Sequence, residues 1–207
     1  MSLELSKKAA AVKPSSTLAI TAKAKELKAQ GKDVVGFGAG EPDFNTPENI
    51  CEAAIKAIKD GFTKYTPASG TNELKAAISK KFKEFNGLDY ATDQIVISNG
   101  GKHSLTNIFT ALINPGDEVI IPAPFWLSYP EIVKLAGGVP VIVTTTKEQN
   151  FKLTAEDLAA AVTDKTKALV LNTPNNPTGM LYTEEELRAI AKVAVEKDFY
   201  VVADEMY

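Results

Sequence analysis

Several residue types are scarce in this chain, and each scarcity excludes a class of protein. There is one cysteine, Cys51, one histidine, His103, and one tryptophan, Trp126. A single cysteine cannot build a disulfide framework, and one cysteine with one histidine cannot supply a zinc cluster. We therefore expect no metal site and a reducing compartment, by default the cytoplasm.

An excess of one charge and long apolar runs are also lacking. Lysine and arginine number 23 against 26 aspartates and glutamates, a net charge of −3 with no basic run, so nucleic acid is not an expected partner. The first 13 residues have no apolar core of a signal peptide, and no stretch is long enough to span a bilayer. We expect neither export nor membrane anchoring.

The 207 residues, 44% of them hydrophobic, suffice for a full core. Short β-branched apolar runs alternate with longer helical patterns, which predicts an α/β fold with crossover units and a mostly parallel sheet. The expected strands are Val34–Gly38, Gln94–Ser98, Glu118–Ile121, Pro140–Thr144, Lys167–Leu171 and Phe199–Ala203.

Helix starts are marked between these runs. Thr46-Pro47 offers a cap with proline in the first turn, and Thr183 with Glu186 forms a capping box. Thr154 with Asp157 is a weaker start of the same kind. Apolar residues at helical spacing from Ile50 to Ile58 predict a packing face after the first of these starts.

A Gly-Gly turn follows one expected strand and opens a helix at Asn99–Lys102. Free N–H groups at a helix start, with glycines that allow close approach and the nearby Lys102 ammonium, would hold a phosphate. The segment is not a P-loop, because Val96 stands where that motif needs glycine and His103 replaces its Ser or Thr. A plain turn is the alternative.

Polar and aromatic residues follow three other expected strands, where open α/β sheets place their sites. Asn172–Gly179 contains two X-Pro bonds that favour a stiff loop, either an amide-presenting site or a rigid turn. Asp204 needs a cationic partner, either a protonated cofactor ring or a lysine or arginine. Trp126 is either a platform for an aromatic ring or a core residue.

The chain stops three residues after Asp204, in the middle of these candidate site residues. A parallel strand normally continues into a covering helix. We therefore expect Tyr207 to be an artificial or truncated terminus.

Taken together, these segments resemble the class I aminotransferases, the fold-type I pyridoxal-phosphate enzymes, and are similar to the bacterial aspartate aminotransferase group. The matching stretches are Val12–Ser15 with Thr17, Gly38–Phe44, Thr63–Tyr65 with Gly70, Gly100–Lys102, Pro124–Trp126 with Tyr129-Pro130, Asn175–Gly179 and Asp204–Tyr207. The resemblance implies a three-layer αβα fold, with an amino-terminal arm and small-domain segment in residues 1–45. Residues 46–207 would then be the amino-terminal part of the large domain that binds pyridoxal phosphate.

The resemblance also implies a role for individual residues. Gly100, Gly101 and Lys102 would bind the cofactor phosphate, and Trp126 would stack on its ring. Asn176 and Tyr207 would hydrogen-bond its phenolic oxygen, Asp204 would pair with its ring nitrogen, and Tyr65 would reach the phosphate in the neighbouring subunit of a homodimer. The substrate-binding residues implied are Gly40, Trp126 and Asn176.

The implied reaction is transamination between an amino acid, aspartate or a similar one, and a 2-oxo acid. The family's Schiff-base lysine follows the motif that ends at Tyr207, so no catalytic residue is assigned in this chain, which we expect to be inactive alone. Two alternatives remain open. One is another reaction of fold-type I pyridoxal-phosphate enzymes, such as that of a β-lyase, and the other is a non-catalytic protein that binds a phosphate ligand.

Overall fold

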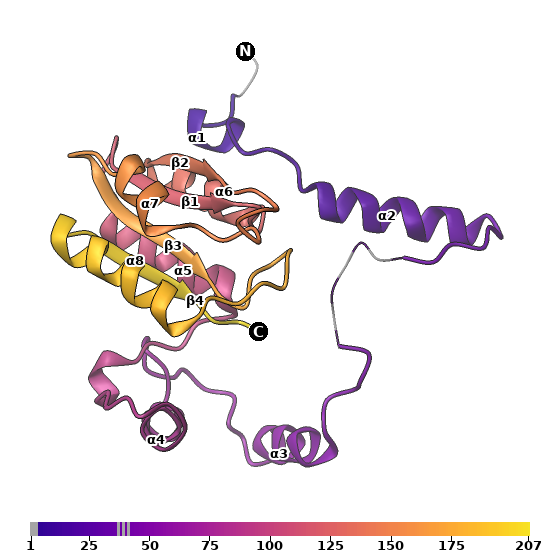
Figure 1. The fold of residues 1–207 in the computed structure, drawn as a ribbon. Coiled ribbons are helices and arrows are strands. Elements are labelled where there is room, and N and C mark those ends of the chain that lie inside the picture. Colours follow the sequence, from indigo (N-terminus) through magenta and orange to yellow (C-terminus); the bar gives the residue numbers. More distant parts are fainter. Residues whose placement is uncertain (1–3, 37, 39, 41) are drawn as a thin grey trace. The chain divides into compact units, whose positions relative to one another are not determined.

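The computed structural model describes residues 4–36, 38, 40 and 42–207, which fall into two compact units (Figure 1). The sheet unit comprises Met1–Lys13 and Ser98–Tyr207, and the helical unit comprises Pro14–Ile97. Each unit has its own local structure. Among the described residues, no helix combines the length and hydrophobicity that crossing a membrane requires.

The sheet unit contains a parallel sheet of four strands in the order β2-β1-β3-β4. The strands are β1 (Glu118–Ala123), β2 (Val139–Thr144), β3 (Thr166–Asn172) and β4 (Tyr200–Asp204). Four of the strands expected from the apolar runs are thereby confirmed. In the pairing of β3 with β4, Asn172 lies opposite Asp204, so both polar residues stand at the carboxyl edge of the sheet.

Helices cover both faces of this sheet, because alternate strand residues point to opposite sides. Helices α5 (Gly101–Leu112) and α6 (Ser128–Ala136) pack on a core that contains Val119 and Ile121. Helices α7 (Ala155–Ala161) and α8 (Glu184–Lys197) pack on a second core that contains Ile120. The three-layer αβα fold is therefore confirmed (Figure 1).

The short helix α1 (Lys7–Ala10) also belongs to the sheet unit, although it is far in sequence from the rest of that unit. It contacts α6, and the Lys13 N–H donates to the Glu131 carboxylate at 3.3 Å. Lys134 donates to the same carboxylate at 2.9 Å. These bonds hold the pKa of Glu131 below its ordinary value, with the Lys134 hydrogen bond as the largest cause.

The helical unit consists of α2 (Ser16–Ala29), α3 (Glu48–Lys59), α4 (Asn72–Asn86) and the 3₁₀ turn η1 (Thr92–Gln94). The predictions of strands at Val34–Gly38 and Gln94–Ser98 are wrong. Residues 34–36 and 38 form no strand, and residue 37 lies outside the described residues. Residues 95–98 also form none, although the Ile97 N–H donates to the Ser69 carbonyl at 3.0 Å. A segment rich in strand-forming residues becomes a strand only where a neighbouring strand is available to pair with it.

The apolar stripe expected on α3 is present, but no residue of this helix is fully buried. Ile50 and Ile58 remain 52% and 65% exposed. Pro47 occupies the N-cap position without a side-chain hydrogen bond, so the cap expected from Thr46 is not formed. Helix periodicity therefore identified the helix and its apolar face, but not what that face contacts.

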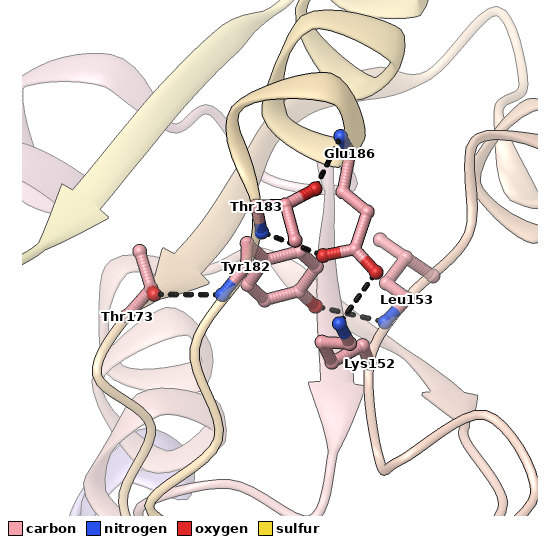
Figure 2. Close-up of polar contacts among 6 residues, drawn as sticks. All are labelled: Lys152, Leu153, Thr173, Tyr182, Thr183 and Glu186. Carbon is pink, nitrogen blue, oxygen red and sulfur yellow. Dashed lines mark hydrogen bonds and ion pairs between the residues drawn. The ribbon is translucent and has the colours of Figure 1, made fainter.

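The expected capping box at the start of α8 is confirmed and belongs to a larger polar network (Figure 2). Thr183 Oγ1 accepts from the Glu186 N–H at 3.3 Å, and the Glu186 carboxylate accepts from the Thr183 N–H at 2.7 Å. The same carboxylate accepts from Lys152 Nζ at 2.5 Å. Nearby, the Tyr182 hydroxyl accepts from the Leu153 N–H at 2.8 Å. The network fixes the segment before α7 against the first turn of α8.

We predict that Glu186→Gln destabilises the protein by about 1 kcal/mol at neutral pH, the upper range for a partly exposed pair. The Lys152 and Thr183 hydrogen bonds hold the pKa of Glu186 below its ordinary value. The charged form therefore stabilises the folded state above the unfolded-state pKa, and this is lost as pH falls through the folded-state pKa. Urea unfolding at pH 7 and below pH 4 measures the difference.

The control is Glu196→Gln on the same helix, whose pair with Lys192 is longer, at 3.8 Å, and exposed. This variant should differ little from the parent at either pH. A Glu186→Gln effect that stayed constant across the acid range would contradict the electrostatic explanation.

Candidate functional site

The carboxyl ends of three neighbouring strands bring the predicted site residues of the sheet unit to one edge. Trp126 follows β1, Asn176 follows β3, and Asp204 ends β4. This edge is where open α/β sheets bind ligands. The bonds among these residues and their neighbours define the geometry of the candidate site.

Asp204 accepts hydrogen bonds on both carboxylate oxygens. Oδ2 accepts from the Tyr129 hydroxyl at 2.7 Å, and Oδ1 accepts from the Met206 N–H at 3.2 Å. Neither lysine nor arginine among the described residues makes an ion pair with this carboxylate. The cationic partner expected from the sequence is therefore not supplied from within the described chain.

Tyr129 itself is nearly inaccessible, with 2% of its surface exposed. Burial raises the pKa of its hydroxyl far above the ordinary value, and the hydrogen bond to Asp204 and the negative charge of Asp204 raise it further. The hydroxyl therefore keeps its proton and serves as a permanent donor to the carboxylate.

Asn172 ties the end of β3 to the loop that follows it. Its Nδ2–H donates to the Asp204 carbonyl at 2.9 Å, and its Oδ1 accepts from the Asn176 N–H at 2.7 Å. Only 7% of Asn172 is exposed. The Asn176 Nδ2–H in turn donates to the Tyr207 hydroxyl at 3.1 Å, so two residues predicted to share one ligand oxygen are in contact.

Trp126 packs in part against the core, and its role as a platform for a ligand ring stays a prediction. It is partly buried against the first core, and its ring meets the Tyr129 ring edge-on, with centroids 5.5 Å apart and planes at 86°. The Lys102 ammonium lies 5.1 Å from the centroid of its ring. Lys102, Trp126, Tyr129 and Asp204 thus form one continuous row of contacts from α5 to β4.

The Gly100–Lys102 segment forms the start of α5, as expected. Gly100 has φ of +82°, which disfavours any side chain there. Within the described residues, the N–H groups of Gly101 and Lys102 donate to no protein acceptor. Two free donors, a helix dipole and an ammonium group favour an anion of phosphate size.

His103 has a structural role at the turn before α5. Its Nδ1 accepts from the Asn99 N–H at 3.1 Å. This bond fixes the turn that precedes α5.

Two predicted site residues, Tyr65 and Gly40, lie in the helical unit. Tyr65 is fully exposed, and Gly40 is exposed in an irregular segment. Their assignment to the site stays a prediction.

Sequence reasoning missed Tyr129 and Asn172 as functional candidates. Both lay inside motifs singled out for other residues, Tyr129 three positions after Trp126 and Asn172 at the end of a strand. A buried polar residue adjoining a site residue is the signal that could have found them, but burial becomes visible only in the folded chain.

The fold and this edge of the sheet define a class: a three-layer αβα protein that has a helix start with free N–H groups, and an aromatic ring and a partly buried carboxylate at the carboxyl ends of the strands. The family model described as "Aminotransferase class I and II" matches residues 32–207. The chain belongs to this family.

Individual relatives agree with this assignment. An aspartate aminotransferase of Bacillus sp. (strain YM-2) is 60% identical over 94% of this chain and 50% of its own length. A probable aspartate/prephenate aminotransferase of Rhizobium leguminosarum bv. phaseoli is 56% identical over 95% of this chain and 49% of its own. The chain therefore spans about half the length of the curated relatives it matches.

Among solved structures, the aspartate aminotransferase from Thermus thermophilus with maleate superposes with a TM-score of 0.96 at 50% identity. The alignment covers 100% of this chain and 54% of that one. The likeness extends over both units of the chain.

We predict that Asn172→Ala destabilises the protein by about 2 kcal/mol, because the variant loses two hydrogen bonds and leaves the Asn176 N–H without its acceptor. Urea denaturation followed by circular dichroism measures the change. Asn107→Ala, on the exposed side of α5, is the matched control and should change stability by less than about 0.5 kcal/mol. Equal effects of the two substitutions would contradict the role given to Asn172.

Proposed function

We propose that this chain contributes the cofactor-binding portion of a pyridoxal-phosphate-dependent aminotransferase. The observation that carries the proposal is the juxtaposition of Trp126 and Asp204, joined through Tyr129, beside the free N–H groups of Gly101 and Lys102. Family membership supports the same conclusion.

The donor set at the sheet edge fits pyridoxal phosphate group by group. The start of α5 with Lys102 offers donors and positive charge for the phosphate. Trp126 offers a face for the ring, and Asn176 with Tyr207 offers hydrogen bonds to the phenolic oxygen. The carboxylate of Asp204, which has no cationic partner in the described chain, suits the ring nitrogen.

When bound, pyridoxal phosphate supplies a ring that withdraws electrons from the substrate α-carbon. The residues of this chain would bind and orient that ring. Asp204 would hold a proton on the ring nitrogen, because a carboxylate fixed by two donors is prearranged to accept a third hydrogen bond. Trp126 would fix the plane of the ring.

We further propose an amino acid and a 2-oxo acid as substrates, with aspartate or a similar amino acid as donor. The relatives named aspartate aminotransferase support this choice, as does the maleate, a dicarboxylate, in the Thermus thermophilus structure. Gly40, Trp126 and Asn176 would contact the substrate. A relative named for both aspartate and prephenate leaves room for a broader specificity.

We also propose that the protein is a cytoplasmic homodimer, in which Tyr65 reaches the pyridoxal-phosphate phosphate group in the neighbouring subunit. Residues 1–45 would form an arm and a small-domain segment, and residues 46–207 the amino-terminal part of the large domain. The exposed Tyr65 ring is compatible with a contact outside its own chain.

We predict that pyridoxamine phosphate, which needs no lysine to bind, quenches the fluorescence of Trp126, the single tryptophan. Asp204→Asn should weaken binding about 10- to 100-fold, because a hydrogen bond to a charged group contributes roughly 1.5–3 kcal/mol. Asp164→Asn, an exposed turn residue, is the control and should bind as the parent does. Equal affinities of all three proteins would contradict the role of Asp204.

The reaction is tested by comparing the 207-residue chain with the full-length gene product. After incubation with pyridoxal phosphate and borohydride reduction, we expect no single lysine of residues 1–207 to carry a stoichiometric adduct, and no aminotransferase activity from these residues alone. The full-length product should convert aspartate and a 2-oxo acid faster than an aromatic amino acid pair. One fully labelled lysine within residues 1–207, or elimination in place of transfer, would refute the assignment.

A further inference from the structure

One buried side chain touches both the carboxylate and the aromatic ring of the candidate site. Tyr129 lies in the first turn of α6, donates its hydroxyl proton to Asp204 Oδ2 at 2.7 Å and meets the Trp126 ring edge-on at 5.5 Å. Only 2% of it is exposed. Its two contacts lead to Trp126, in the segment that follows β1, and to Asp204, at the end of β4, 3 and 75 positions away in the chain.

The hydroxyl is the only side-chain donor that the described residues offer to the Asp204 carboxylate. The other bond to that group comes from the Met206 backbone and is longer, at 3.2 Å. Without the hydroxyl, rotation of the carboxylate about its last torsion would be opposed by this one bond alone. Short hydrogen bonds to charged groups are both stronger and more directional than neutral ones.

The ring of Tyr129 limits Trp126 in the same way. An edge-to-face contact favours one relative orientation of two aromatic rings and adds roughly 0.5–1.5 kcal/mol to their burial. Trp126 also contacts the Lys102 ammonium, which lies 5.1 Å from the centroid of its ring. Tyr129 is therefore placed to set the carboxylate and the ring relative to each other.

We propose that Tyr129 is a positioning residue that fixes the Asp204 carboxylate toward a protonated ring nitrogen and the Trp126 face toward the same ring. This inference rests on the proposed function, because it assigns Tyr129 a purpose in holding that heteroaromatic ligand. Tyr129 itself does not touch the ligand in this proposal. Its effect is transmitted through Asp204 and Trp126.

The first experiment needs no ligand. Tyr129→Phe removes the hydroxyl and keeps the ring, and Asp204→Asn removes the charge that accepts it. Urea unfolding of both single variants and the double variant gives their coupling. Each variant changes the unfolding equilibrium constant by some factor relative to the parent. We expect the factor of the double variant to differ at least fivefold from the product of the factors of the two single variants. Additive effects would overturn the proposal, because the hydroxyl would then not act on Asp204.

The second experiment uses two ligands that differ only at the ring nitrogen: pyridoxamine phosphate and its 1-deaza analogue, in which CH replaces that nitrogen. Both are titrated against Trp126 fluorescence. Tyr129→Phe should weaken pyridoxamine phosphate at least fivefold and the deaza analogue less than twofold. A purely structural role would weaken both alike, and that result would overturn the proposal while leaving the cofactor site intact.

Tyr182→Phe is the matched control. It removes another hydroxyl of the sheet unit with one hydrogen bond, the one accepted from the Leu153 N–H, and should leave the ratio of the two affinities unchanged. If the parent chain binds neither ligand, the proposed function fails and the positioning role fails with it, whatever the coupling to Asp204. If Asp204→Asn does not fold, the ligand comparison with Tyr129→Phe alone decides.

Discussion

The parallel pairing of β3 with β4 is the constraint on which the candidate site depends. It places Asn172 directly opposite Asp204, so the Asn172 amide can reach both the Asp204 carbonyl and the loop that carries Asn176. A shift of one residue would turn Asp204 to the other face of the sheet. The buried apolar residues of β3 oppose such a shift, because they fill both cores at once.

The polar groups at this edge of the sheet form hydrogen bonds with one another. Asp204 accepts from Tyr129 and Met206, Asn172 is bonded at both ends of its amide, and no buried side-chain polar atom of the described residues lacks a partner. A satisfied network in a low-dielectric environment is rigid. The groups left without protein partners, the N–H donors of Gly101 and Lys102, lie at the helix start where an anion would bind.

Sequence patterns were reliable where each element's partner lies in the same unit. The four apolar runs from Glu118 onward became paired strands, and the capping box at Thr183 formed as expected. The runs at residues 34–38 and 94–98 have similar composition but no strand pairing among the described residues. The apolar stripe of α3 shows the same limit, since Ile50 and Ile58 stay exposed.

The sequence by itself determined the αβα class, the helix start at Gly100, and the family, because these depend on local periodicity, capping chemistry and motifs in a fixed order. It also identified Trp126, Asn176 and Asp204 as residues that follow strands. Only the tertiary structure decided what these residues contact. Tyr129 and Asp204 are 75 positions apart, and they meet because α6 packs on β1 and β2 of the sheet in which β4 also pairs, a relation between distant segments that no local pattern encodes.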